Sequence, residues 1–179
     1  MPWQTLSTRT AYENPWIRVR EDQVVHPDGS ESVYGIVELR PAVFVVAVDD
    51  EERVALIEID RYTVGASVEI PGGGGDGQDP LEAAQRELLE ETGLTASDWT
   101  PLGEVHALNG AALANEHVFL ARGLSTGADA SHTQQEEGIS AVRFVPFGEV
   151  VAMIGDGRIR DNETVAALAL AAIRLGRLR

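Results

Sequence analysis

Short apolar segments separated by polar turns run along most of the chain, a pattern that predicts strands. The continuous apolar run at residues 42–48 is typical of a central strand that is buried on both faces. Residues 49–52 form a polar turn, and the segment at 54–59 predicts the next strand. Similar segments later in the chain predict three further strands, at residues 102–107, 116–121 and 139–145.

The N-terminal region predicts an antiparallel strand pair ahead of this sheet. A segment at 16–25 leads into turn residues at 27–30, and residues 33–39 run back. A two-stranded hairpin is at best marginally stable in water, so this pair needs a further surface to pack on. We therefore divide the chain into an N-terminal strand pair at residues 1–40 and a larger domain at residues 41–179.

Start and stop signals mark a helix just after a glycine-rich run. Asp79 is a typical N-cap, Pro80 suits the first helical position, and Gly93 suits a left-handed C-cap. Beyond this helix the pattern predicts, in order, a mobile polar loop, a short helical segment and a capped helix: residues 123–138, the residues after Pro146, and the helix from Asp161 to near Gly176.

Three carboxylates, those of Glu87, Glu90 and Glu91, fall within a narrow arc of the first predicted helix. Like charges three and four residues apart weaken a helix, so their position beside a glycine loop favours a bound cation. Mg²⁺ and Mn²⁺ prefer oxygen ligands and suit carboxylates joined by substrate phosphates. The alternative is a solvated helix face. Leu81 and Leu88 lie at core-facing spacing, which turns the glutamates outward, toward whatever the glycine loop surrounds.

From Gly72 to Leu94 the sequence resembles the Nudix box, G-x5-E-x7-R-E-U-x-E-E-x-G-U, where U is aliphatic. The matching residues are Gly72, Arg86, Glu87, Leu88, Glu90, Glu91, Gly93 and Leu94. The resemblance implies a hydrolase of nucleoside diphosphates linked to another moiety, with an α/β/α sandwich fold, a mixed sheet and divalent metals. Over nearly the whole chain the order of elements is similar to that of ADP-ribose pyrophosphatase-like Nudix proteins. In these an N-terminal strand pair commonly exchanges contacts with a second subunit, which implies a homodimer; the alternative is that the pair packs on its own domain.

The box departs from the family pattern in its loop. Gln78 stands where the pattern has its first glutamate, which removes one negative charge and leaves a hydrogen-bonding group. We expect weaker or altered metal binding rather than loss of the site. Pro71 also sits one residue closer to Gln78 than the usual loop would place it. The loop is therefore one residue short, and either the Pro71 or the Gly72 carbonyl could face the metal.

The resemblance also implies the catalytic roles. The implied metal ligands are Gly72, Glu87, Glu90 and Glu91, in a site for Mg²⁺ or Mn²⁺. Arg86 would orient the carboxylates through charge-assisted hydrogen bonds. Nudix enzymes often draw a further carboxylate, a general base or metal ligand, from a distant loop, and Glu136 and Glu137 are candidates. Glu137 is favoured, and the alternative is a solvated acidic loop.

Substrate contacts are implied at four positions. Arg61 would bind phosphate while Tyr62 stacks on a base, and Glu69 and Glu116 lie where relatives place acidic residues near the metal loop and the ribose. A surface or structural role is the alternative for each. The loop at residues 106–110 lacks the proline that relatives often carry there, which leaves the choice of ADP-ribose as substrate open.

Composition limits the possible functions. A net charge of −15 disfavours nucleic-acid binding and also repels a phosphate substrate, so we expect a strong requirement for metal. With no cysteine, the chain has no thiolate zinc site and no disulfide. It shows no membrane-spanning stretch, and a cytoplasmic location is the default expectation.

Three functions remain open on sequence alone. The leading one is a Mg²⁺-dependent pyrophosphohydrolase that cleaves a nucleoside diphosphate sugar to a nucleoside monophosphate and a sugar phosphate. The second is a catalytically weak ligand-binding or regulatory Nudix-like protein, and the third is a hydrolase that removes oxidised nucleoside triphosphates. A dinucleotide-binding Rossmann motif is disfavoured, because the predicted helix starts after the last glycine rather than within the motif.

Overall fold

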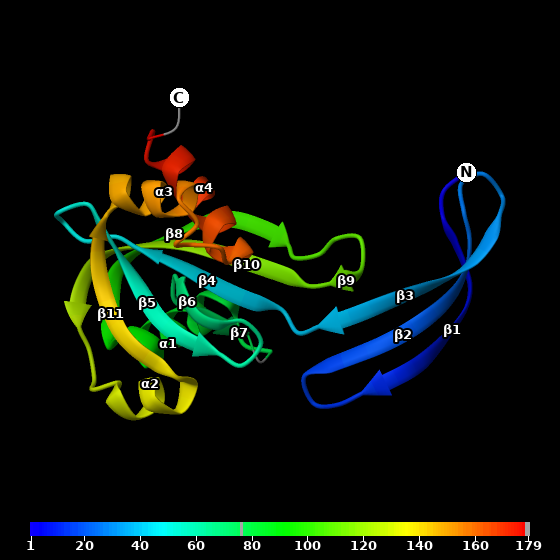
Figure 1. Ribbon diagram of the computed structural model, residues 1–179, viewed down its shortest axis with the longest axis horizontal. Helices are drawn as coiled ribbons and strands as arrows, with labels where there is room; N and C mark the ends of the chain where they lie inside the picture. The colour runs from blue at the N-terminus through cyan, green and yellow to red at the C-terminus, as the bar shows by residue number, and fades with distance from the viewer. Residues whose placement is uncertain (76, 178–179) are drawn as a thin grey trace. The chain divides into compact units, whose positions relative to one another are not determined.

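The computed structural model describes residues 1–75 and 77–177, and the chain folds into two compact units (Figure 1). Unit 1 consists of Met1–Pro41 and His106–Asn115, and unit 2 consists of Ala42–Val105 and Glu116–Arg179. Among the described residues all helices belong to unit 2. No helix in these residues has the length and apolar character needed to cross a membrane.

Unit 1 is a four-stranded sheet in the order β1–β2–β3–β9. Its strands are β1 (Gln4–Glu13), β2 (Ile17–Val25), β3 (Glu31–Leu39) and β9 (Ala112–Leu113). β2 and β3 pair antiparallel from Ile17 opposite Leu39 to Val25 opposite Glu31, so the predicted strand pair is confirmed. The chain reverses between them at Gly29, whose φ of 90° favours glycine.

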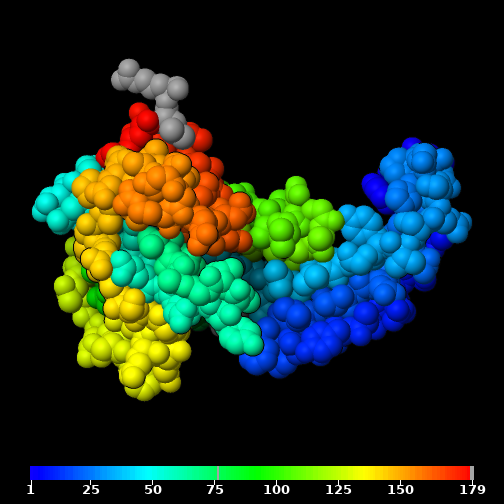
Figure 2. Space-filling view, in the orientation of Figure 1, coloured from blue at the N-terminus to red at the C-terminus, as the bar shows by residue number. Residues whose placement is uncertain are grey.

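β1 was not predicted from the sequence pattern. It pairs antiparallel with β2, yet all 10 of its residues are exposed. Its threonines, serine and arginine are interrupted by isolated apolar residues, so no apolar face of period two marks it as a strand. In the space-filling view, residues of β1 and β2 (blue) form a broad part of the visible surface of unit 1 (Figure 2).

Unit 2 contains two sheets, in the orders β7–β4–β10–β8 and β11–β5–β6. Their strands are β4 (Ala42–Ala47), β5 (Arg53–Arg61), β6 (Gly65–Glu69), β7 (Gly72–Gly74), β8 (Leu94–His106), β10 (Asn115–Thr126) and β11 (Ile139–Pro146). β4 runs parallel to β10 and antiparallel to β7, so this sheet is mixed, as expected. β5 lies antiparallel to both of its neighbours.

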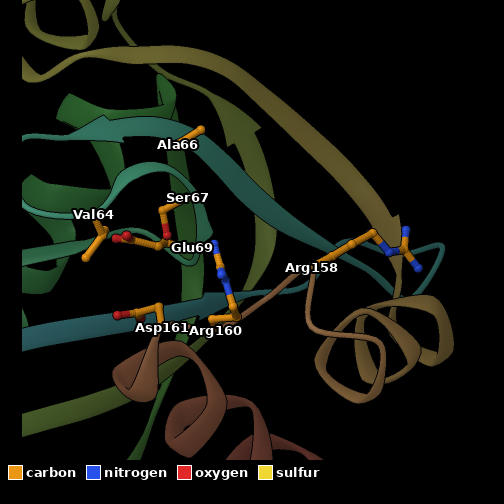
Figure 3. Close-up of a pocket in the computed structure, with 7 residues that line it drawn as sticks. All are labelled: Val64, Ala66, Ser67, Glu69, Arg158, Arg160 and Asp161. Carbon is orange, nitrogen blue, oxygen red and sulfur yellow. The ribbon is translucent and has the colours of Figure 1, made fainter.

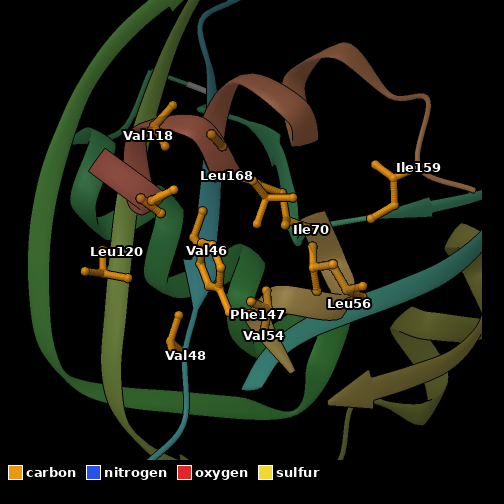
Figure 4. Packing of buried hydrophobic residues seen from close by; sticks show 14 of the residues in the cluster. Val46, Val48, Val54, Leu56, Ile70, Val118, Leu120, Phe147, Ile159 and Leu168 are labelled. Atoms are coloured by element: carbon orange, nitrogen blue, oxygen red, sulfur yellow. The ribbon is translucent and has the colours of Figure 1, made fainter. Parts of the chain in front are cut away.

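Helices cover both faces of the β4 sheet. They are α1 (Pro80–Thr92), α3 (Phe147–Gly155) and α4 (Asn162–Arg174). The short helix α2 (Ser131–Glu137) lies instead against α1 and β11. Successive side chains of a strand point to opposite faces. Val46 accordingly packs in one core with Phe147 of α3 and Leu168 of α4 (Figure 4), whereas Val45 packs in another core with Leu88 of α1. The predicted α/β/α sandwich is therefore confirmed.

Local sequence signals set the limits of α1. Asp79 caps the helix by accepting a hydrogen bond from the Leu81 N–H at 2.9 Å, and Pro80 is its first residue. Gly93 ends it with a φ of 71°, in the left-handed region. The helix start and stop that the sequence predicts are both confirmed.

The segment at 123–138 forms regular structure, so the expectation of a mobile polar loop is wrong. β10 continues through Thr126, and α2 occupies most of the remainder. The Gln134 side chain donates a hydrogen bond to the Glu91 backbone carbonyl at 2.9 Å. This tertiary contact helps to hold α2 beside α1, and no local sequence pattern reveals it. The two predicted C-terminal helices are confirmed as α3 and α4, the latter capped by Asp161.

Candidate active site

The glycines of β7 bring the backbone into direct contact with its neighbours. A Cβ atom on Gly72 would lie 2.5 Å from Cδ1 of Phe44 and 2.6 Å from the Val43 carbonyl oxygen. A Cβ atom on Gly73 would lie 2.5 Å from Oε1 of Glu87. Only glycine leaves room here for a carboxylate of α1 to rest against the strand. The glycine run and α1 thus line two sides of the same site.

The box glutamates face this glycine strand, but two of them are buried rather than turned outward. Glu91 is 1% exposed and its Oε2 accepts a hydrogen bond from the Gly72 N–H at 2.7 Å. Glu87 is 5% exposed and its Oε1 lies 3.0 Å from Nη2 of Arg86. Glu90 stays partly exposed. Glu87 and Glu91 thus turn toward the glycine run, as expected, but they are buried because β7 covers that side of the helix.

Burial changes the acidity of both carboxyl groups. It raises the pKa of Glu91 well above its usual range; the Gly72 N–H opposes this shift, and repulsion from Glu87 and Glu137 adds to it. Burial raises the pKa of Glu87 to about 7, opposed by the charge of Arg86 and reinforced by the charges of Glu137 and Glu90. The site therefore concentrates more negative charge than its own arginine neutralises.

Glu137 stands near these carboxylates, and Glu136 has a different neighbour. The charge of Glu137 acts on both Glu87 and Glu91, although it comes from α2, far along the chain. Glu136 instead lies 3.3 Å from Nδ1 of His132, and both of these side chains are well exposed. Of the two candidates for the extra carboxylate, the structure thus brings Glu137 to the box.

Arg86 links the glycine loop to the helix. Its Nη1 donates to Oε2 of Glu90 at 2.8 Å, and its Nη2 donates to the Gly74 carbonyl at 2.8 Å. Its Nε donates to Oε1 of Gln78 at 3.0 Å. The amide of Gln78 therefore occupies a supporting position beside the box and contributes no charge to it.

The donor chemistry suits a hard divalent cation. The side chains around β7 offer carboxylate oxygens, and their raised pKa values mark an unmet need for positive charge. Within the described residues, however, no group of three or more histidine, aspartate or glutamate side chains is arranged to hold a metal ion as it stands. The contacts to Gly72 and Arg86 engage the carboxylates instead. For Glu90 to bind a metal ion, its carboxylate would therefore have to turn away from Arg86.

The predicted substrate residues lie in two different settings. Arg61 donates to Glu69 with its Nη2 at 2.6 Å from Oε2, and Glu69 is 7% exposed. The hydrogen bond to Glu69 is the main cause of the raised pKa of Arg61, and the charges of Glu91 and Asp161 add to it. Arg61 therefore stands between the box and the N-terminus of α4. Tyr62, by contrast, is fully exposed and touches none of this group.

Glu116 belongs to a second acidic group that the sequence did not predict as a whole. It is 5% exposed, and its Oε2 is buried without a hydrogen-bond partner among the described residues. Burial raises its pKa, and the charge of Asp161 raises it further. Burial likewise raises the pKa of Glu163 to about 7, with a hydrogen bond to Asp161 as the next cause. From the sequence, Asp161 could be interpreted only as a helix cap.

A pocket of about 470 Å³ opens beside Glu69 and Asp161 (Figure 3). Its remaining lining residues are Val64, Ala66, Ser67, Arg158 and Arg160. They come from the β5–β6 hairpin and from the connection between α3 and α4, which are far apart in the sequence. No sequence motif joins these two segments, so the pocket was not predicted.

Buried carboxylates on a helix, an arginine that holds them and a glycine strand make an arrangement whose chemistry suits an oxygen-bound cation beside a phosphate-bearing substrate. Two family profiles match consecutive parts of the chain. The profile of the nucleoside diphosphate sugar hydrolase N-terminal domain matches residues 3–37, and that of the NUDIX domain matches residues 38–168. The chain belongs to the Nudix family, as the box predicted.

Individual relatives span almost the whole chain. An ADP-ribose pyrophosphatase of Mycobacterium tuberculosis (strain ATCC 25618 / H37Rv) is 32% identical over 179 residues, which cover 97% of this chain and 86% of that protein. A methanol dehydrogenase activator of Bacillus methanolicus is 30% identical, covering 92% of this chain and 90% of that protein. The crystal structure of an ADP compounds hydrolase has the same fold, with a TM-score of 0.85 at 22% identity, covering 99% of this chain and 98% of that one. The chain is thus a hydrolase of the Nudix pyrophosphatase type.

Proposed function

We propose that this Nudix hydrolase cleaves the diphosphate bridge of a nucleoside diphosphate sugar, such as ADP-ribose, to a nucleoside monophosphate and a sugar phosphate. The packing of Glu87 and Glu91 against the glycine strand, with the charge of Glu137 acting on both, carries the proposal. The N-terminal profile and the relative named as an ADP-ribose pyrophosphatase support the substrate class.

We assign Glu87, Glu90, Glu91 and the Gly72 carbonyl as ligands of Mg²⁺ or Mn²⁺. Val45 N–H already donates to the Pro71 carbonyl at 2.9 Å, so that carbonyl is used in the sheet. The Gly72 N–H points away from β4 to Glu91, and the N–H and C=O of one strand residue point to the same side. The Gly72 carbonyl is thus the freer of the two. A divalent cation bound there supplies charge neutralisation and lowers the pKa of a bound water.

The remaining residues position the reactants and move the proton. Glu137 is the proposed acceptor of the proton from the attacking water, since it lies near the box without belonging to α1. Arg86 holds the box carboxylates in place. Arg61, held by Glu69, is proposed to bind the diphosphate. Tyr62 and Glu116 are proposed to contact the nucleoside and a sugar hydroxyl.

Product analysis across a panel of substrates tests this proposal. The full-length protein is incubated with Mg²⁺ and with nucleoside diphosphate sugars, dinucleotides or nucleoside triphosphates, and the products are separated by chromatography. We expect AMP and ribose 5-phosphate from ADP-ribose, and little release of pyrophosphate from triphosphates. Faster cleavage of triphosphates would move the protein to the class that removes oxidised nucleotides.

A regulatory function is the second candidate, and two observations favour it. Gln78 replaces a box carboxylate, and a relative of similar length is named as an activator of methanol dehydrogenase. On this alternative, nucleotide sugars bind with metal but stay uncleaved over hours. Equilibrium binding measured beside turnover on the same samples separates the two functions.

We also propose a homodimer in which residues 1–40 form the exchanged element and residues 41–179 form the hydrolase domain. The sheet of unit 1 exposes large apolar side chains: Trp3, Leu6, Tyr12, Trp16 and Val33. A second copy is the expected cover for this surface. A cytoplasmic location is proposed as well, and cell fractionation checks it.

A further inference from the structure

The pocket beside Glu69 has two walls of different character. The β5–β6 hairpin contributes Val64, Ala66 and Ser67, which are small or apolar. The α3–α4 connection contributes Arg158, Arg160 and Asp161, which are charged. At about 470 Å³ the pocket has the size of a small-molecule site.

A hydrogen bond connects the region of the charged wall, at the start of α4, to the chain segment that leads into the box. The Ile70 N–H donates to Oγ1 of Thr164 at 3.1 Å, which ties the first turn of α4 to the strand end that leads into the glycine run. Two residues later, the Gly72 N–H binds Glu91. Arg61 feels the charges of both Glu91 and Asp161. Arg61 is bonded to Glu69, which lines the pocket, so a diphosphate bound at Arg61 would have the pocket next to it.

The two arginines of the wall differ in their bonding. Arg158 is held by Asp156, with its Nη2 at 2.8 Å from Oδ2, and it also approaches Glu149. In Figure 3 it extends away from the other labelled side chains. Arg160 makes no hydrogen bond or ion pair within the described part of the chain, and Figure 3 shows it rising toward Glu69 and Ser67. Arg160 therefore has unused donors directed at the pocket.

The lining matches hydroxyl groups better than a nucleobase. No aromatic side chain lines the pocket among the described residues, so a base has nothing to stack on. Asp161 accepts hydrogen bonds, and Arg160 only donates them. A hydroxyl group can donate to the first and accept from the second, and a sugar carries several of them side by side.

We propose that this pocket binds the sugar of the sugar phosphate half of the substrate, and that Arg160 determines the preference for a sugar. The proposal rests on the proposed function, because the diphosphate must lie at the box for the sugar to reach the pocket. Its new content is the orientation. The nucleoside lies on the other side of the cleavage site, outside this pocket.

Binding of the two expected products tests the orientation without turnover. Isothermal titration calorimetry measures ribose 5-phosphate and AMP, each with Mg²⁺, on the wild type, Arg160→Ala and Arg143→Ala. We expect Arg160→Ala to weaken ribose 5-phosphate at least tenfold, as for the loss of a charged hydrogen bond, and to leave AMP unchanged. Arg143→Ala is the matched control, because Arg143 is an exposed arginine of β11 that does not line the pocket, and it should change neither. No binding of ribose 5-phosphate to the wild type, or a loss confined to AMP, overturns the proposal.

Turnover provides a second readout and separates the two proposals. The methyl ester of ADP keeps the nucleoside and the diphosphate but has no sugar at the far end. We expect the wild type to favour ADP-ribose over this ester in kcat/KM, Arg160→Ala to lose that preference through KM, and Arg160→Lys to recover part of it. An unchanged preference in Arg160→Ala contradicts the inference and leaves the proposed function intact. If neither compound is cleaved, the proposed function fails, and the calorimetry alone decides the role of the pocket.

Discussion

At the scale of single residues, Arg86 controls the shape of the box. Its guanidinium contacts the glycine loop, Gln78 and two glutamates of α1 at once. Such a fork holds several acceptors in fixed directions, which a lysine ammonium could not do. Because Gln78 is neutral, it does not offset the positive charge of Arg86, which interacts with the two glutamates.

Replacing Gln78 tests how much its missing charge matters. A carboxylate in Gln78→Glu adds one negative charge beside the box, which should favour cation binding modestly because position 78 is exposed to solvent. We expect the Mg²⁺ concentration for half-maximal activity to fall a few-fold, and to rise in Gln78→Ala. Metal titrations of steady-state rates measure both. Equal values in all three proteins would mean that position 78 does not influence the metal.

At the scale of elements, the contact between α1 and β7 depends on two glycines with different neighbours. A Cβ atom on Gly72 meets a ring and a backbone carbonyl, neither of which can easily move. A Cβ atom on Gly73 meets only the carboxylate end of Glu87, which can swing aside. The same added methyl group should therefore reduce stability at position 72 and activity at position 73.

Two alanine substitutions separate these costs. Gly72→Ala should lower the free energy of unfolding by about 1–3 kcal/mol, as overpacking usually does. Gly73→Ala should keep most of its stability but lose activity, because Glu87 is displaced. Gly148→Ala is the control, since nothing lies within 4 Å of its added Cβ. Denaturant melts and kcat measure the two effects; equal stability losses at positions 72 and 73 would contradict this reading.

The N-terminus of α4 should make stability depend on pH. The pKa of Glu163 is raised from its ordinary value of 4.5 to about 7, first by burial, then by its hydrogen bond to Asp161 and by the charges of Asp161 and Glu116. Between these pH values the native state keeps a proton that the unfolded chain has lost, so stability falls as pH rises through this window. Glu163→Gln cannot ionise at this position. The melting temperature of the variant, relative to that of the wild type, should therefore increase as the pH rises from about 5 to about 8. A constant difference across this range would show that Glu163 does not titrate in this way.

Elements with strong local signals could be predicted, and those held by distant contacts could not. The caps at Asp79 and Gly93 marked α1, and the apolar run marked β4. β1 has no buried face, and α2 depends on Gln134 reaching the backbone of α1, so neither left a pattern. The box glutamates were visible in the sequence. The pocket was not, because its residues meet only when the β5–β6 hairpin and α4 fold together.

At the scale of the whole molecule, charge and exposed apolar surface set the conditions for function. A net charge of −15 repels an anionic substrate, and the divalent cations that we propose would reverse this field locally where the diphosphate binds. Unit 1 exposes several large apolar side chains, and every residue of its strand β1 is exposed. Both features make the isolated, metal-free chain an incomplete form of the proposed enzyme.

The homodimer predicts a definite mass. Multi-angle light scattering should give twice the chain mass of 19.3 kDa. The double substitution Leu6→Glu and Trp16→Glu places charges on the exposed apolar surface of unit 1 and should shift the mass toward one chain. Val151→Glu, at an exposed apolar residue of α3, is the control and should not. A wild-type protein of single mass at micromolar concentration would rule out a stable dimer.

The central claim is that the carboxylates of α1 make a metal-dependent hydrolytic site. The most direct measurement is the rate of ADP-ribose cleavage with Mg²⁺ and with EDTA, in the wild type, Glu90→Gln and Glu82→Gln. Glu82 lies exposed in the first turn of the same helix and provides the matched control. We predict cleavage that requires Mg²⁺, survives Glu82→Gln, and falls by roughly a hundredfold or more in Glu90→Gln. Cleavage that continues in EDTA, or that is unaffected by Glu90→Gln, would contradict the account.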